Sequence, residues 1–93
     1  PQYQIGPYRV DFALVASGTV KLAVECDGRE WHERNWERDI QRQNYIEGQG
    51  WHVLRFTGKQ LYEDPDKCVD EIIQALLIYR SQERVAQKCH DVA

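Results

Sequence analysis

Residues 8–27 read YRVDFALVASGTVKLAVECD. Apolar and polar side chains alternate from Tyr8 to Val15 and again from Val20 to Cys26, which is typical of β-strands. Gly18 lies between the two runs and can adopt the positive φ that a three-residue hairpin loop requires. The stretch therefore predicts an antiparallel hairpin.

The loop length also predicts the register of this hairpin. It places Asp11 opposite Glu25 and Arg9 opposite Asp27, so that three carboxylates share one face. The other face is apolar and needs a helix or a further layer to cover it. We expect the core on that side, formed by Tyr8, Val10, Phe12, Leu14, Val20, Leu22, Val24 and Cys26.

A helix is expected over residues 33–47, where helix formers dominate and Pro and Gly are absent. Trp36, Ile40 and Asn44 or Glu47 mark one of its faces, and a basic stripe marks another, formed by Arg34, Arg38 and Arg42. Gly48–Gly50 ends this helix, and Trp51–Thr57 is predicted as a mostly buried strand.

Asp64 and Pro65 predict the N-cap and first position of a second helix. Apolar residues recur at helical spacing from Val69 to about Tyr79. Residues 81–93 are polar, so they either extend this helix or fray. Upstream, residues 3–5 are interpreted as a short edge strand.

The resulting order is (β)ββαβα, which predicts an α/β (α+β) domain with a mixed sheet flanked by helices. With 93 residues and 11.0 kDa, the chain fits a single domain over residues 1–93 with its core at about 3–80. It begins at Pro1 and contains no methionine, which we interpret as a domain of a longer protein.

Composition restricts the location and the partners. No apolar run approaches the roughly 20 residues of a membrane span, and no signal peptide is recognisable, so we expect a soluble, cytoplasmic protein without membrane partners. Three scattered cysteines fit a reducing compartment. The net charge of −3 argues against binding nucleic acid by bulk electrostatics, so any such contact must be local.

Asp11 and Glu25, facing each other across paired strands, repel by roughly 0.2–1 kcal/mol. A divalent cation such as Mg²⁺ or Mn²⁺ would offset this repulsion, since both prefer hard oxygen ligands. The alternative is that the carboxylates are solvated and paired with Arg9 and Lys21. Nearby, His32 is either a proton carrier beside a metal or a polar surface residue.

The runs at residues 8–12, 24–32, 38–43 and 50–57 together resemble the PD-(D/E)XK, or restriction-endonuclease-like, nuclease superfamily. They look most similar to the branch of the very-short-patch repair (Vsr-like) endonucleases and small helicase-associated domains. The resemblance extends from about Tyr8 to Ile73. It implies a restriction-endonuclease-like mixed sheet, although the helix that precedes the first strand in the family is missing, so a homodimer or a larger parent protein is expected to complete the core.

The resemblance also implies a site. Asp11 matches the metal-binding aspartate, Glu25 matches the acid of the (D/E)XK triplet, and the Cys26 carbonyl would be a further metal ligand. Asp27 stands where the triplet has lysine, so it would hold a second ion or orient His32. His32 matches the acid/base histidine of the repair branch, and no structural zinc is expected.

Nucleic-acid contacts follow from the same resemblance. Trp31 is either a base-stacking wedge or a cover of the sheet end. Contacts to the backbone are expected from the helix, through Arg34, Arg38, Arg42 and Gln43, although helical ion pairs with Glu30, Glu37 or Asp39 could instead neutralise the arginines.

The resemblance implies a Mg²⁺-dependent endonuclease that hydrolyses phosphodiester bonds, with Mn²⁺ able to substitute for Mg²⁺. The expected substrate is DNA, in a repair, mobile-element or helicase-associated process. One alternative is a catalytically inactive module of the same fold that binds RNA or DNA, with which Asp27 in place of lysine is compatible. Another is a protein-interaction domain, which the net charge permits.

Overall fold

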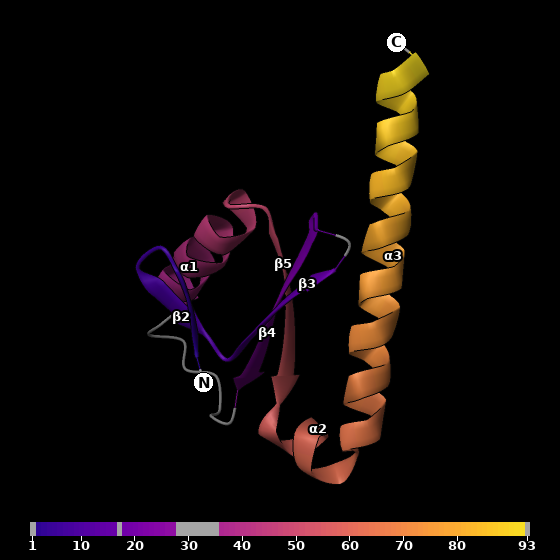
Figure 1. The fold of residues 1–93 in the computed structure, drawn as a ribbon. Helices are drawn as coiled ribbons and strands as arrows, with labels where there is room; N and C mark the ends of the chain where they lie inside the picture. Colours follow the sequence, from indigo (N-terminus) through magenta and orange to yellow (C-terminus); the bar gives the residue numbers. More distant parts are fainter. Residues whose placement is uncertain (1, 17, 28–35, 93) are drawn as a thin grey trace.

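The computed structural model describes residues 2–16, 18–27 and 36–92, with the backbone alone described for Asp27 and for residues 84–92 (Figure 1). The elements follow in the order β1 (Tyr3–Ile5), β2 (Tyr8–Val10), β3 (Phe12–Ala16), β4 (Val20–Asp27), α1 (Trp36–Gly48), β5 (Trp51–Thr57), α2 (Gly58–Glu63) and α3 (Pro65–Val92). This mixed arrangement confirms the predicted α+β class and the edge strand at residues 3–5.

A three-stranded sheet with β4 at its centre organises the fold. β4 pairs antiparallel with β3 and parallel with β5, and α1 lies in the crossover between the two parallel strands. The register between β3 and β4 is the predicted one, with Phe12 opposite Val24 and Ala16 opposite Val20.

The prediction of one continuous strand from Tyr8 to Val15 was wrong, because the chain bends at Asp11. The Asp11 carboxylate accepts a hydrogen bond from the Cys26 backbone N–H at 2.7 Å, so a side chain stands where a ladder bond would continue. β2 turns away and pairs with β1, which sets Arg9 opposite Gln4 rather than opposite Asp27. Asp27 instead pairs with Thr57 of β5.

Both faces of β4 are buried, so the expectation that the core lies on one side of the hairpin was also wrong. Leu22 and Val24 pack with Phe56 and the inner side of α3, as predicted for that face. Phe12 and Leu14 are 52% and 38% exposed because β3 is an edge strand.

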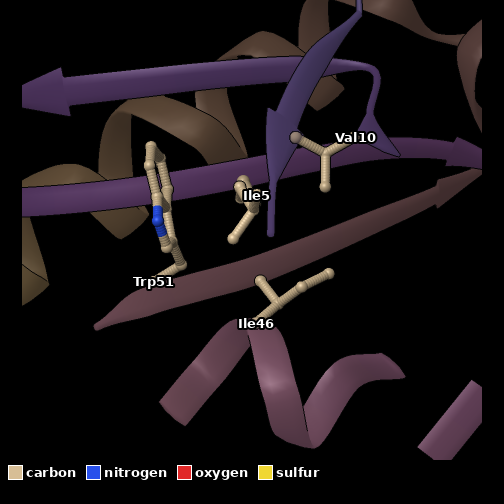
Figure 2. Packing of buried hydrophobic residues seen from close by; sticks show 5 residues of the cluster. Ile5, Val10, Ile46 and Trp51 are labelled. Carbon is tan, nitrogen blue, oxygen red and sulfur yellow. The ribbon is translucent and has the colours of Figure 1, made fainter. Parts of the chain in front are cut away.

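The opposite face carries a second cluster, which α1 covers. Val10 belongs here, and not with Leu22, because the chain bends after it. Figure 2 shows Ile46 of α1 directed toward Ile5, Val10 and Trp51. Trp36 and Ile40 are about half exposed, and the inward side of α1 carries charged residues in its first turns and Ile46 further on.

The C-terminal helices are started by two local caps. Thr57 and Gln60 form a capping box that begins α2, an element that the sequence pattern did not predict. The predicted cap of α3 is confirmed, since Asp64 Oδ1 accepts from the Lys67 N–H at 3.1 Å. α3 continues to Val92, which resolves the open choice for residues 81–92, and the Tyr79 ring stacks on His52 of β5 with centroids 3.6 Å apart.

Gly6 forms the turn between β1 and β2 with a φ of +57°. A methyl group at this position would overlap the ring of Tyr45 in α1, so the turn needs glycine for both conformation and space.

Within the described residues, no helix combines the length and the apolar character needed to cross a membrane.

Candidate active site

Six residues from four parts of the fold line a hollow of about 230 Å³: Asp11, Glu25, Cys26, Asp39, Arg42 and Arg55. Glu25 and Arg55 lie near the carboxyl ends of the parallel strands β4 and β5, in register with each other. Asp39 and Arg42 come from the first half of α1, which covers this face of the sheet. The topology thus brings together charges from distant positions in the chain.

Asp11 enters the hollow from the bend between β2 and β3. Its Oδ2 accepts a hydrogen bond from the Cys26 backbone N–H at 2.7 Å, which connects the bend to the end of β4. Asp11 and Glu25 therefore line one hollow, although the β3–β4 pairing begins at Phe12 and Val24 and does not set them opposite each other as predicted.

Glu25 is buried, with 8% of its surface exposed, and arginines pair with both of its oxygens. Oε1 forms an ion pair with Arg42, and Oε2 accepts from Arg55 Nε at 3.2 Å. Burying a carboxylate costs free energy, which the ion pairs with the two arginines offset.

Arg55 is held in turn by Asp39. Its two terminal nitrogens donate to the two oxygens of Asp39, each at 2.7 Å, in a planar fork. Hydrogen bonding from Arg55 lowers the pKa of Asp39, and the same bonds raise the pKa of Arg55 further above its usual value. Asp39, Arg55 and Glu25 therefore form a charged chain from α1 through β5 to β4.

Cys26 contributes a thiol that remains protonated. Burial and the neighbouring Asp11 carboxylate both raise its pKa. Because the thiolate is the reactive form, this cysteine is unsuited to act as a nucleophile.

The hollow offers the kind of donor that a hard divalent cation binds. No group of three or more His, Cys, Asp or Glu side chains suited to a metal ion occurs in the described part of the chain. Mg²⁺, however, is commonly held by one or two carboxylates and completes its shell with water and phosphate oxygens. Asp11 and Glu25 fit that requirement in chemistry, and a cation would compete with Arg42 and Arg55 for Glu25.

A second hollow of about 350 Å³ adjoins the first, since Asp39 and Arg42 line both. Its remaining lining comes from Tyr8, Arg38 and Gln41. Arg42 also lies over the Tyr8 ring, 5.9 Å from its centroid. The lining of the second hollow includes two arginines and one carboxylate; Arg42 is paired with Glu25 and Asp39 with Arg55.

The predicted nucleic-acid-binding residues on α1 do not all lie at one place in the structure. Arg38 is exposed on the second hollow, whereas Arg42 turns inward to Glu25, so the two do not form one exposed basic stripe. Gln43 donates to Glu47 at 3.2 Å. The side chains of four predicted residues lie outside the described part of the chain: Asp27, Trp31, His32 and Arg34.

Arg55 was missed by the sequence reasoning, and Asp39 was considered there solely as an ion-pair partner for the helix arginines. A signal existed for Arg55, because it is a charged residue inside the otherwise apolar run Val53–Phe56. A charge in a buried strand requires a partner. The identity of that partner depends on the packing of α1.

Most of the chain is similar to a known protein family and to uncharacterised bacterial proteins. The model of the family REase_MTES_1575 matches residues 1–76. The uncharacterised protein YcjD of Escherichia coli is 32% identical over 75 residues, which cover 81% of this chain and 61% of YcjD. An uncharacterised protein of Haemophilus influenzae is 31% identical over 77 residues, covering 83% of this chain and 44% of that protein. The chain thus spans less than two thirds of either relative, and no solved structure matches it significantly.

Proposed function

The chain belongs to the restriction-endonuclease-like family REase_MTES_1575, and from this premise we propose that it is a metal-dependent endonuclease that hydrolyses phosphodiester bonds in DNA. One observation carries the proposal: Asp11 and Glu25, remote in sequence, line one hollow together with two arginines. Within the family, we propose kinship with the Vsr-like repair branch, on the motif residues Glu25 and His32.

Asp11, Glu25 and the Cys26 carbonyl are the proposed holders of Mg²⁺ or Mn²⁺. When bound there, the cation would supply Lewis-acid activation of a water and of a phosphate. His32 is the proposed proton carrier, and Asp27 is proposed to orient it or to assist the cation.

Arg55 supplies the positive charge that the triplet lacks in this chain, where Asp27 stands in place of lysine. Its guanidinium contacts Glu25 from the neighbouring strand and remains charged at any physiological pH. Three of its five N–H groups bind Asp39 and Glu25, so two remain for the oxygens of a phosphate in the hollow. Asp39 acts as a positioning residue that fixes the orientation of Arg55.

The second hollow is the proposed path of the nucleic-acid backbone. Arg38 and Arg42 offer cationic donors there, and Tyr8 offers an aromatic edge beside them. Such a local basic surface is compatible with a chain whose net charge is −3. Trp31, Arg34 and Gln43 are proposed as further contacts.

A catalytically inactive nucleic-acid-binding module is the second candidate. The observation that favours it is the pairing of both Glu25 oxygens with arginines, which leaves this carboxylate neutralised without a metal. In that case the two hollows would bind nucleic acid through Arg38, Arg42 and Arg55.

A cleavage assay separates these functions. Supercoiled plasmid, single-stranded DNA and RNA are incubated with the chain in Mg²⁺, in Mn²⁺ or in EDTA. We expect metal-dependent cleavage of DNA that falls at least about 100-fold in Asp11→Asn and in Glu25→Gln. Glu63→Gln, an exposed acid on α2, is the matched control and should cleave like the wild type.

Two outcomes would contradict the endonuclease proposal, provided that circular dichroism shows the variants to be folded. The first is nucleic-acid binding without cleavage under any ion, which supports the binding module. The second is cleavage that persists in both variants, which would place the reaction outside this hollow.

A further inference from the structure

α3 carries apolar side chains on two sides, one packed against the sheet and one exposed. Its inner side, including Cys68, Ile72 and Leu76, packs against the sheet. On the other side, Val69, Ile73 and Leu77 are 52%, 50% and 58% exposed. Figure 1 shows α3 at the flank of the domain.

These three residues form an outer stripe with a charged residue at each end: Asp66, Val69, Ile73, Leu77 and Arg80. All five are exposed. The spacings along the stripe are 3, 4, 4 and 3 residues, so the stripe reads the same in both directions about Ile73, except that the charges at its two ends are opposite.

We propose that the chain forms a symmetric dimer in which the outer stripes of two copies pack antiparallel. A two-fold axis at Ile73 sets this residue against its own copy and Val69 against Leu77. The same axis sets Asp66 of each copy against Arg80 of the other, which makes two ion pairs. A parallel pair would instead bring Asp66 to Asp66 and Arg80 to Arg80, so charge complementarity selects the antiparallel arrangement.

The partner is a second copy because the stripe is complementary to itself. The paired segment is about 21 Å long at 1.5 Å per residue, so the interface is small and its formation depends on protein concentration. The hollow with Asp11 and Glu25 lies on the α1 face of the sheet, opposite the α3 face. The dimer therefore leaves both sites open, and the inference is independent of the proposed function.

Analytical ultracentrifugation of the chain over a wide concentration range tests the dimer. The wild type should shift with concentration from 11.0 kDa to twice that mass. Ile73→Asp should raise the dissociation constant at least about tenfold, because it places two buried carboxylates at the axis. Ile78→Asp is the matched control: Ile78 is 54% exposed but lies off the stripe, so the dissociation constant should not change.

The register is tested by exchanging the end charges. Arg80→Glu should weaken the dimer, and the double variant Asp66→Arg with Arg80→Glu should restore it, provided that circular dichroism shows each variant to be folded. A wild type that remains monomeric at every concentration overturns the proposal and leaves the stripe for a different partner. An equal effect of Ile73→Asp and Ile78→Asp, or a double variant weaker than Arg80→Glu, overturns it as well.

Discussion

Replacing Arg55 with methionine would remove the guanidinium that joins Asp39 to Glu25. Methionine replaces the apolar stem of the arginine side chain and lacks the guanidinium, so the packing of the stem within β5 is largely kept. The variant should destabilise the protein because a buried carboxylate loses one of its two arginine partners.

The magnitude follows from the three hydrogen bonds that are lost. Two of them end on Asp39, whose side chain is 29% exposed and can be rehydrated, so they contribute about 0.5–1 kcal/mol each. The third ends on Glu25, whose side chain is 11% exposed, and its loss costs about 1–2 kcal/mol because Arg42 remains. The sum is roughly 2–4 kcal/mol, a large share of the stability of a small domain.

Urea unfolding at pH 7, followed by circular dichroism, measures this loss as a shift of the midpoint at an unchanged m-value. Arg38→Met is the control, because Arg38 is an exposed arginine of α1 and should change stability by less than about 0.5 kcal/mol. Adding Glu25→Gln to Arg55→Met should recover part of the loss, since it removes the stranded charge. An Arg55→Met protein within about 0.5 kcal/mol of the wild type would refute the reasoning.

Three further outcomes are expected. Arg55 lowers the pKa of Asp39 in the folded state, so the unfolded chain takes up the proton first as the pH falls. The free energy of unfolding of the wild type, measured by urea titration, should exceed that of Asp39→Asn by roughly 1–2 kcal/mol above about pH 5, and this difference should shrink below about pH 4. A difference that does not depend on pH would contradict this. Arg42→Gln should tighten Mn²⁺ binding by about 1–2 kcal/mol, because it frees a Glu25 oxygen. Calorimetry should show this as a dissociation constant that is roughly 5- to 30-fold lower. Weaker binding would argue against a metal at Glu25. Gly6→Ala should lower the thermal midpoint of unfolding more than Gly18→Ala. Both glycines have a positive φ, but an added methyl group would meet an aromatic ring at Gly6 and open space at Gly18. Equal shifts of the midpoint would contradict this.

Local patterns in the chain were sufficient for much of the architecture. The β3–β4 register follows from strand periodicity and loop length, and Trp51–Thr57 and the Asp64 cap follow from signals within a few residues. The same patterns predicted Asp11 opposite Glu25 in a strand pair, whereas in the structure the β3–β4 pairing begins at Phe12 and Val24 and the two carboxylates share one hollow. The register, the strand and the cap depend on residues that lie close together in the chain, so local sequence patterns are sufficient to predict them.

The bend at Asp11 and the charged chain through Arg55 were decided by the tertiary structure. The bend depends on a bond to Cys26, 15 residues away, which competes with an ordinary ladder bond. Arg55 meets Asp39 and Glu25 at separations of 16 and 30 residues, once α1 has packed across the sheet. Periodicity shows which residues share a face, but the docking of a second element decides which charges a buried arginine will meet.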